Sequence, residues 1–237
     1  MPTCPRDDFP TTEVTDLEQT SQRRATTRNA TLGQLAYWFG KRLVDIVASV
    51  VLLVILSPIL AAIAIAIWID SGVPIIYLSQ RIGRYGQPIT VLKFRTMRDG
   101  SHHHLRELLT ADEELRMEYG VSRKLRVDPR RTRVGTFLRR TSLDELPQLL
   151  NVLFGEMSLV GPRPYFPGEL VGRPEADEIL RVRPGITGLW QVSGRSDRSF
   201  EERLGFDVDY VRRRGLRLDT SIVVRTFSAV VSGRGAY

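Results

Sequence analysis

Cysteine is almost absent from this sequence, and its scarcity excludes several kinds of protein. The 237 residues contain one cysteine, Cys4, within a polar stretch at the start of the chain. A single thiol cannot build a disulfide framework, and nothing around it indicates a cysteine-based metal site or nucleophile. The composition therefore suits a domain that faces a reducing cytoplasm.

Acidic residues are outnumbered by basic ones. Lys and Arg total 34 against 27 Asp and Glu, which gives a net charge of +7 and a pI near 10.0. Nucleic acid, anionic lipid and phosphorylated substrates all favour a basic protein, and arginine grips phosphate with a planar fork. No helix-turn-helix, zinc or aromatic-stacking module is present, so we expect no nucleic-acid partner. An alternative hypothesis is a membrane-anchored nucleic-acid-binding protein, whose affinity for nucleic acid should weaken steeply as the salt concentration rises.

Apolar periodicity is missing from residues 1–31, which predicts a disordered tail. A cleavable signal peptide is not predicted, because the apolar stretch begins only after about forty residues and is not followed by the usual small-residue cleavage site. The length suits one globular domain with appendages. We therefore divide the chain into this tail, a membrane-inserted segment at 32–72 and a globular domain at 73–237.

The most apolar part of the chain is Ile46–Ile69, IVASVVLLVILSPILAAIAIAIWI. Roughly twenty such residues are enough to cross a bilayer as a straight helix. Ser57 and Pro58 fall at the middle, however, where a proline tends to kink a helix, and each half alone is too short to span. From these residues, a spanning helix and a bent helix that re-enters the same leaflet both stay open.

Positive residues flank the apolar stretch on both sides, whereas a single span should carry them mainly on its cytoplasmic side. They are Lys41, Arg42, Arg81, Arg84 and Lys93. This distribution favours two cytoplasmic ends. Asp45 follows Lys41 and Arg42 by about one helical turn, so we expect it to pair with them at the membrane surface.

Beyond the apolar stretch, two short runs rich in β-branched and aromatic residues predict a β-hairpin. They are PIIYLSQ and ITVLKFRTM, separated by turn residues at 83–88. Within the second run, Lys93 can belong to a solvated strand face or to a site. The charged stretch at 100–128 then predicts one or two surface helices.

Two adjacent acids, Asp144 and Glu145, lie in the stretch where we expect the chemistry of this protein to take place. Ser142-x-x-Glu145 has the form of a capping box, and leucines then recur at helical spacing. Pro147 fits only if the helix starts late, with Asp144 near its cap at an exposed helix mouth. The plain alternative is that both acids complement the helix dipole.

Arginines on either side of this acid pair favour a phosphate instead. Arg139 and Arg140 precede it, and Gly161-Pro162-Arg163-Pro164 follows it. Each proline fixes its own φ and restricts its predecessor, so Arg163 stands on a stiff backbone. A stiff, charged fork near a helix start suits a phosphate group.

The rest of the chain predicts three helices and one tight loop. A polar acidic helix is expected at about 169–180, an amphipathic helix at 200–214 and an apolar helix at 216–233. The last two can lie in the lipid headgroup plane as well as on the core. Between the first and the second of these helices, residues 182–195 combine glycines with Trp190, which is typical of a structural turn against a buried ring.

Three motifs that are separated along the chain resemble the motifs of one family, and they occur in the same order as in that family. SLDELPQLLNVLFGEMSLVGPRP, with LKFRTM upstream and RPGITGLWQVSGR downstream, resembles the bacterial sugar transferases called monotopic phosphoglycosyl transferases, or polyprenyl-phosphate hexose-1-phosphate transferases. The resemblance covers roughly Lys41 to Tyr237, and the closing RGAY resembles the exopolysaccharide branch.

The resemblance implies a helix-rich α+β fold at the cytoplasmic face of the bacterial inner membrane. Its parts would be a kinked re-entrant N-terminal helix, with Ser57 and Pro58 as the kink, a short β-hairpin, and amphipathic interfacial helices around a small catalytic domain. Membrane lipids would then be partners of the chain. A homodimer is a further possible assembly.

The resemblance also implies a reaction and a set of site residues. Galactose or glucose 1-phosphate would pass from a UDP-sugar to undecaprenyl phosphate, with release of UMP, as the first membrane step of exopolysaccharide, O-antigen or capsule synthesis. Asp144 would be the nucleophile that carries the sugar phosphate, and Glu145 would hold Mg²⁺. The substrate phosphates would meet Arg163, Arg139 and Lys93, and the nucleotide would meet Gln191 and Arg195.

Two further hypotheses stay open. A non-catalytic scaffold for polysaccharide assembly predicts normal function after Glu145→Gln. An ordinary glycosyltransferase that moves only the sugar predicts UDP, rather than UMP, as the released product.

Overall fold

The structure, a computed structural model, describes residues 32–98, 101–122, 125, 128–194 and 199–232. The predicted disordered tail at 1–31 lies outside these residues. The helices are α2 (Leu32–Ser71), α3 (Ser101–Ala111), α4 (Glu113–Ser122), α5 (Arg133–Thr141), α6 (Gln148–Phe154), α7 (Ala176–Ile179), α8 (Phe200–Arg213) and α9 (Leu216–Ser232). The strands are β1 (Ile76–Ile82), β2 (Pro88–Phe94), β3 (Ser158–Val160) and β4 (Gly185–Thr187). Three short 3₁₀ turns are η1 (Arg84–Gly86), η2 (Leu143–Glu145) and η3 (Trp190–Val192). The helix-rich α+β fold is confirmed.

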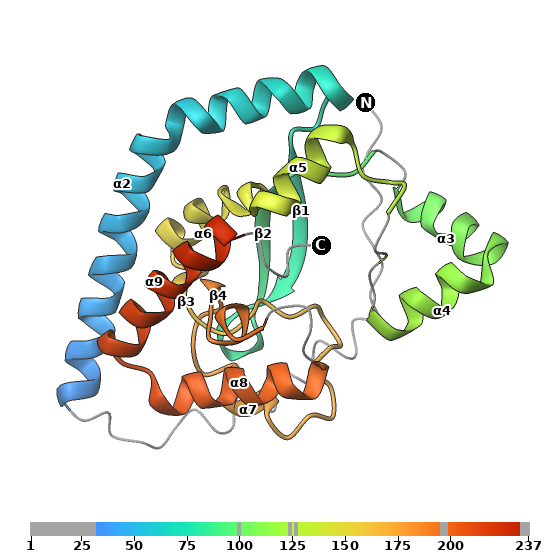
Figure 1. The fold of residues 1–237 in the computed structure, drawn as a ribbon. Coiled ribbons are helices and arrows are strands. Elements are labelled where there is room, and N and C mark those ends of the chain that lie inside the picture. Colours follow the sequence, from blue (N-terminus) through green and yellow to red (C-terminus); the bar gives the residue numbers. More distant parts are fainter. Residues whose placement is uncertain (1–31, 99–100, 123–124, 126–127, 195–198, 233–237) are drawn as a thin grey trace.

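Helix α2 contains the apolar stretch and bends about midway, running along one side of the domain and then over its top (Figure 1). Pro58 lies inside this helix and has no N–H, so the carbonyl of Val54 loses its usual partner. The Ser57 hydroxyl donates to that carbonyl with an Oγ–O distance of 2.8 Å. The hydroxyl thereby satisfies a backbone group that the proline would otherwise leave without an intrahelical bond.

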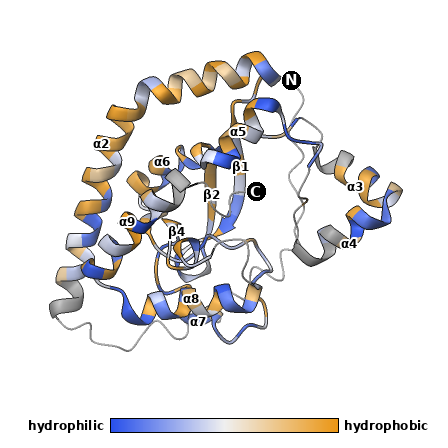
Figure 2. Cartoon of the chain, in the orientation of Figure 1, coloured by the Kyte–Doolittle hydropathy of each residue, from blue (hydrophilic) through white to orange (hydrophobic). Residues whose placement is uncertain are grey.

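Helix α2 is mostly apolar (Figure 2), and many of its large apolar side chains are exposed. The stretch Ala36–Ser71 is long and apolar enough to cross a membrane, judged by length and composition, and only 11% of its apolar window is buried. An exposed apolar helix of this kind is costly in water. This surface therefore indicates association with a membrane, while the monotopic arrangement stays a prediction.

The predicted hairpin is confirmed, because β1 and β2 pair antiparallel with Tyr77 opposite Lys93. The hairpin is held from two sides. Val91 packs with Val152 and Met157 in one buried cluster, which attaches α6. Phe94 packs with Ile67 and other residues of α2 and with α5 in a second cluster. Helix α2, the hairpin and the two helices around the acid pair are thus joined through two clusters that meet at the hairpin.

A second, parallel sheet of two strands was not predicted from the sequence. Ser158 pairs with Gly185 and Val160 with Thr187, and β4 lies within the stretch 182–195 that we expected to be a loop. The strands approach so closely that a Cβ on Gly185 would lie 2.1 Å from the backbone nitrogen of Gly161. Glycine is therefore required there for steric reasons.

The remaining helices match the predictions unevenly. The amphipathic helix α8 and the apolar helix α9 are confirmed, and the charged stretch forms α3 and α4, which stand apart from the rest of the domain (Figure 1). The predicted helix at 169–180 is wrong, because only α7 is helical there. Gly172 has a φ of +71°, and Pro174 cannot donate a helical hydrogen bond.

The expected pairing of Asp45 with Lys41 and Arg42 is also wrong. Asp45 is buried, and its carboxylate accepts from the Ser158 hydroxyl at 2.8 Å and from the Leu159 backbone nitrogen at 3.0 Å. This end of α2 lies against β3 rather than in open solvent. A buried backbone N–H needs an acceptor, and the carboxylate of Asp45 provides one.

Candidate active site

The acid pair lies in η2, between α5 and α6. The predicted capping box is wrong, because Ser142 is left-handed with a φ of 58° and its side chain makes no capping bond. The late helix start is confirmed, since α6 begins only after Pro147. A single 3₁₀ turn therefore carries both acids, and it connects two helices that pack on the hairpin.

Asp144 is buried rather than exposed at a helix mouth, with an exposed fraction of 9%. Burial raises the pKa of Asp144 to about 6, and the negative charge of Glu145 adds to the rise. The positive charges of Lys93 and Arg139 lower the pKa and so act against both effects. The result is a carboxylate that is ionised at neutral pH but is more basic than an ordinary aspartate, which suits a nucleophile.

Glu145 points to the hairpin, where its Oε1 lies 2.7 Å from the Nζ of Lys93. Both side chains of this ion pair are partly exposed, at 24% for Lys93 and 35% for Glu145. Lys93 faces the same side of the hairpin as Tyr77, its partner in register. The ion pair of Glu145 and Lys93 thus lies at a surface that solvent can reach, beside the buried Asp144.

Arg139 completes the group on the other side of Asp144. Its Nε donates to the Thr96 hydroxyl at 2.9 Å, and burial lowers the pKa of the guanidinium, with the charge of Arg131 acting in the same direction. The negative charge of Asp144 raises that pKa again. The structure therefore brings together four predicted site residues: Asp144, Glu145, Lys93 and Arg139.

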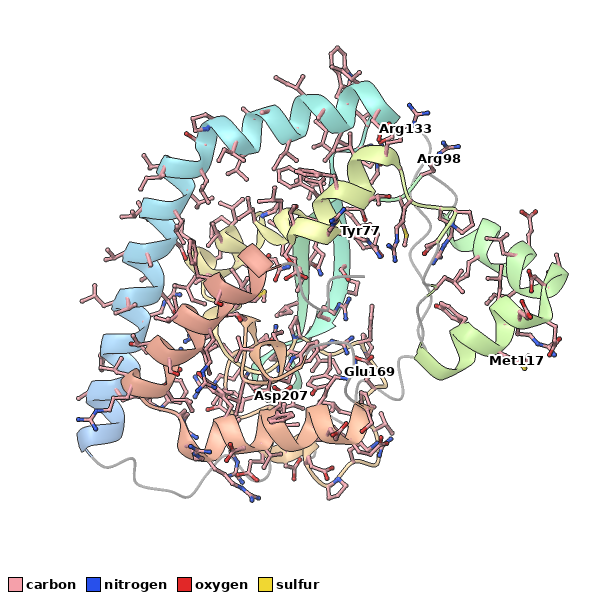
Figure 3. The ribbon with its side chains drawn as sticks, viewed as in Figure 1. Tyr77, Arg98, Met117, Arg133, Glu169 and Asp207 are labelled. Carbon is pink, nitrogen blue, oxygen red and sulfur yellow. The ribbon has the colours of Figure 1, made fainter. Side chains whose placement is uncertain are left out.

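Arg163 lies on the loop that follows β3. Its backbone nitrogen donates to Asp207 at 3.2 Å, and its Nη2 lies 3.5 Å from an oxygen of Glu169. Its ion pair is thus with Glu169 rather than with Asp144. In Figure 3, Tyr77 on β1 lies above Glu169.

Asp207 is a site-building residue that sequence reasoning missed. It is fully buried on α8, and its Oδ2 accepts from the Tyr165 hydroxyl at 2.6 Å as well as from Arg163. Burial raises the pKa of Asp207 to about 7. A signal existed in the sequence, because Asp207 shares the apolar face of an amphipathic helix with Leu204 and Val211.

The two predicted nucleotide contacts have different outcomes. Gln191 lies in η3, and its Nε2 donates to the Ile186 carbonyl at 3.2 Å, which ties the loop to β4. Arg195 lies outside the described residues. The roles of both in nucleotide binding stay predictions.

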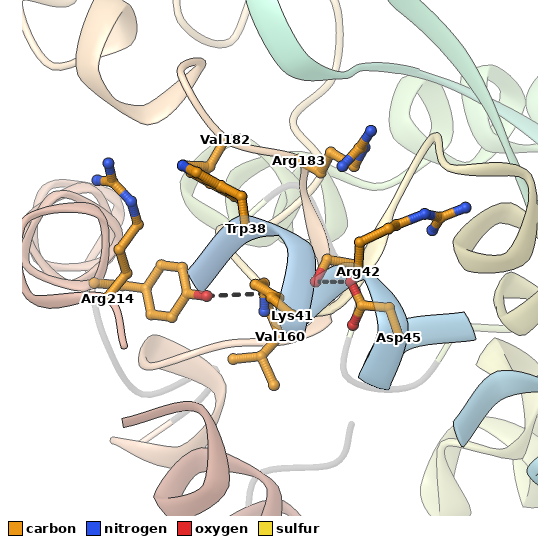
Figure 4. A pocket seen from close by; sticks show the side chains of 10 residues that line it. Trp38, Lys41, Arg42, Asp45, Val160, Val182, Arg183 and Arg214 are labelled. Carbon is orange, nitrogen blue, oxygen red and sulfur yellow. Dashed lines mark hydrogen bonds between the residues drawn. The ribbon is translucent and has the colours of Figure 1, made fainter. Parts of the chain in front are cut away.

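A separate, small hollow lies between the start of α2 and β3 (Figure 4). None of the predicted site residues lines it. Its polar groups are engaged in joining elements: Lys41 pairs with Asp219 at 2.8 Å, and Arg183 donates to the Gly155 carbonyl at 2.6 Å. We therefore interpret it as a seam between the membrane helix and the rest of the domain.

The donor set at η2 fits magnesium. Among the residues that the structure describes, no three His, Cys, Asp or Glu side chains gather as a protein-only metal cage. Mg²⁺ does not need such a cage, since it commonly binds one or two carboxylates together with substrate phosphates and water. Asp144 and Glu145 are such a pair, and each repels the other's negative charge.

Comparison with known proteins identifies the family. The bacterial sugar transferase family matches residues 36–233. Over 200 residues, the chain is 46% identical to an undecaprenyl-phosphate galactose phosphotransferase of Salmonella typhimurium, which covers 84% of this chain and 42% of the relative. Over 199 residues, it is 44% identical to the exopolysaccharide production protein ExoY of Sinorhizobium fredii, which covers 84% of this chain and 88% of the relative.

An uncharacterized sugar transferase of Haemophilus influenzae is 47% identical over 210 residues, which cover 88% of this chain and 44% of that protein. The chain thus spans less than half the length of two of these relatives and most of the third. The family match covers most of the chain, including η2 and the Arg163 loop. The chain therefore belongs to the bacterial sugar transferase family.

Proposed function

We propose that this protein transfers a sugar 1-phosphate from a UDP-sugar to undecaprenyl phosphate and releases UMP. The names of the Salmonella and Sinorhizobium relatives support phosphosugar transfer to this lipid in exopolysaccharide synthesis. The observation that carries the proposal is the buried carboxylate of Asp144, whose pKa is raised, between the cations Lys93 and Arg139. Galactose or glucose is the sugar we propose.

In the first step, an oxygen of Asp144 attacks the phosphorus that bears the sugar. The bond from this phosphorus to the bridging oxygen breaks, and UMP leaves with the electron pair. In the second step, an oxygen of undecaprenyl phosphate attacks the same phosphorus and releases the carboxylate of Asp144. Lys93, Arg139 and Arg163 stabilise the negative charge on the phosphoryl oxygens, because positioning and electrostatics dominate catalysis of phosphoryl transfer.

Glu145 would hold the magnesium ion, together with the substrate phosphates and water. When bound, the ion supplies positive charge that reduces the repulsion between a carboxylate and a diphosphate. Lys93 keeps the side chain of Glu145 directed at the site through their ion pair. Glu145 is therefore a positioning and charge-balancing residue in this proposal, and Asp144 is the group that forms the bond.

The membrane helix explains how a soluble nucleotide and a lipid meet. We propose that α2 re-enters the cytoplasmic leaflet of the inner membrane, so that both of its ends lie on the cytoplasmic side. Its bend, its outward apolar surface and the cations at both ends support this arrangement. The acid pair would then lie near the depth of the lipid phosphates.

The test is to trap the covalent intermediate on the full chain. Incubation with a UDP-sugar carrying a radiolabelled β-phosphate, without the lipid acceptor, should label the wild type and release UMP. Asp144→Asn should carry no label. Asp112→Asn, which removes an exposed acid on the α3–α4 arm, is the matched control and should label normally.

Two results would overturn the proposal. A label that survives in Asp144→Asn would exclude this residue as the nucleophile. Release of UDP instead of UMP would favour a glycosyltransferase that moves only the sugar.

A further inference from the structure

Arg81, on β1, lies directly against the loop that carries Arg163. The backbone nitrogen of Ile82 donates to the Tyr165 carbonyl at 2.9 Å, which aligns the strand with the loop. The Nη1 of Arg81 donates to the Pro164 carbonyl at 3.2 Å. Strand and loop are therefore fixed relative to each other at the position of both arginines.

The guanidinium of Arg81 is held against an aromatic ring of the Arg163 loop. Its Cζ lies 3.2 Å from the centre of the Phe166 ring, so the two planes stack. Its Nε donates to the Ser79 hydroxyl at 3.0 Å, which bends the side chain back along β1. Alternate residues of a strand share a face, so Arg81 and Ser79 point to the same side as Tyr77, whose partner in register is Lys93.

Charges of both signs surround Arg81. Burial lowers the pKa of Arg81 to about 10, and the charge of Arg163 acts in the same direction, whereas Glu169 and Glu145 raise it. The guanidinium stays charged at neutral pH. Among the described residues, Glu169 forms the ion pair with one of these arginines, and its Oε1 lies 3.5 Å from the Nη2 of Arg163.

Arg81 also keeps donors for a ligand. A guanidinium has five N–H donors in a planar fork. The bonds to Ser79 and Pro164 use the Nε and one hydrogen on Nη1, and within the described part of the chain the Nη2 group has no hydrogen-bond partner. A flat, positively charged fork with free donors matches the geometry of a phosphate.

We propose that Arg81 and Arg163 form a second phosphate subsite that holds the phosphate of the leaving nucleotide. The inference rests on the proposed function and assigns a separate cation pair to each phosphate of the UDP-sugar. Lys93 and Arg139 serve the phosphorus that Asp144 attacks. When the bridging bond breaks, the electron pair moves to the oxygen of UMP, and Arg81 stabilises the charge that develops there.

The test is the affinity of the full chain for UMP, measured by calorimetry in detergent micelles. Arg81→Met keeps much of the apolar contact with Phe166 but removes the charge and the donors. It should weaken UMP binding about tenfold or more, because hydrogen bonds to charged groups carry that much affinity. Arg81→Lys should recover only part of the loss, since it restores the charge without the planar fork.

Arg84→Met is the matched control. Arg84 lies on the same hairpin, its Cζ is 4.4 Å from the centre of the Tyr85 ring, and its Nε donates to the Arg181 carbonyl at 2.9 Å. Arg84 thus makes the same kinds of contact as Arg81, one with an aromatic ring and one with a backbone carbonyl, but within the turn of the hairpin. Arg84→Met should bind UMP like the wild type.

The outcomes separate this inference from the proposed function. Wild-type affinity for UMP in Arg81→Met overturns the subsite, as does a wild type that binds no UMP. If Arg81→Met does not fold, the test is the affinity of Arg81→Lys for UMP. A wild-type value would show that the planar guanidinium is not needed and would overturn the subsite as proposed. If UMP binding behaves as expected but no label forms on Asp144, the covalent mechanism fails and the subsite stands.

Discussion

Asp144 shows how one residue combines reactivity with a cost in stability. Its carboxylate is buried beside Glu145, and the nearby cations compensate for this only in part. The pKa rises from an ordinary value of 3.8 to about 6. The folded protein therefore binds a proton at this position more tightly than the unfolded chain, so ionisation of Asp144 lowers the free energy of unfolding.

This predicts that Asp144→Asn stabilises the fold at neutral pH. Below about pH 4, Asp144 is protonated in the folded and the unfolded state, so the protein keeps its full stability. That stability decreases as the pH rises through about 6 and the buried carboxylate ionises. Near pH 7.5, the variant should gain on the order of 1–3 kcal/mol in the free energy of unfolding. Thermal unfolding of both proteins across this range measures the difference, which should shrink toward pH 4. An equal difference at every pH would show that the burial of charge is not its cause.

At the scale of elements, we expect the bend of α2 to depend on Ser57 and Pro58. If both ends of the helix are cytoplasmic, cysteines placed at Phe39 and Val73 in a Cys4→Ser background should resist an impermeant maleimide in intact spheroplasts. Both positions are exposed in the protein, with fractions of 77% and 68%, so they should react after lysis. Reaction of one of them in intact spheroplasts would indicate a spanning helix.

Removal of the proline should change this pattern. Pro58→Leu restores a backbone N–H and favours a straight helix, which is long enough to span. We expect the cysteine at one end to become reactive in intact spheroplasts. Val54→Leu, a change one turn away that keeps the proline, is the matched control and should leave both ends protected.

The Arg163 loop is a second element whose position rests on one side chain. Asp207→Ala removes the acceptor for both the Tyr165 hydroxyl and the Arg163 nitrogen, and should cost about 2–4 kcal/mol of unfolding free energy, because both donors are left buried. Asp207→Asn retains an acceptor and should lose less. Asp209→Ala, on the exposed side of the same helix, is the control. Thermal melts that fail to rank Asp207→Ala as the least stable variant would contradict this role.

Elements with strong patterns could be predicted from the sequence, and those set by tertiary contacts could not. The alternation in the hairpin and the amphipathic spacing of α8 are local signals, and both elements are present. The pair β3 and β4 gives no such signal, because each strand has three residues and the pairing depends on the close approach of Gly161 and Gly185. At the site, Asp144 and Glu145 stand out by adjacency, whereas Arg81 joins them only through the folded hairpin.

At the scale of the whole molecule, a buried polar network joins the membrane helix to the end of the chain. Lys41 pairs with Asp219 on α9 at 2.8 Å, and the hydroxyls of Tyr37 and Tyr210 also bond to Asp219, at 3.1 Å and 2.9 Å. Local sequence could not show this contact, since the partners are 178 residues apart. The membrane segment is thus anchored to the last helix of the domain.

We predict that Lys41→Met destabilises the protein by about 2–4 kcal/mol, because it leaves a buried carboxylate without its cation. The double variant Lys41→Met/Asp219→Leu should lose less than Lys41→Met alone, since no unpaired charge remains. Thermal unfolding in detergent measures both. Additive losses in the double variant would show that the two residues act independently.

The contact between Gly161 and Gly185 also ties together two segments with different tasks. A Cβ on Gly188 would lie 2.3 Å from the Gly161 carbonyl, so the backbone before Arg163 is wedged against the backbone before Trp190. Neither segment can shift without pushing the other. A displacement of either segment must therefore be transmitted to the other, so that the two backbones are mechanically coupled.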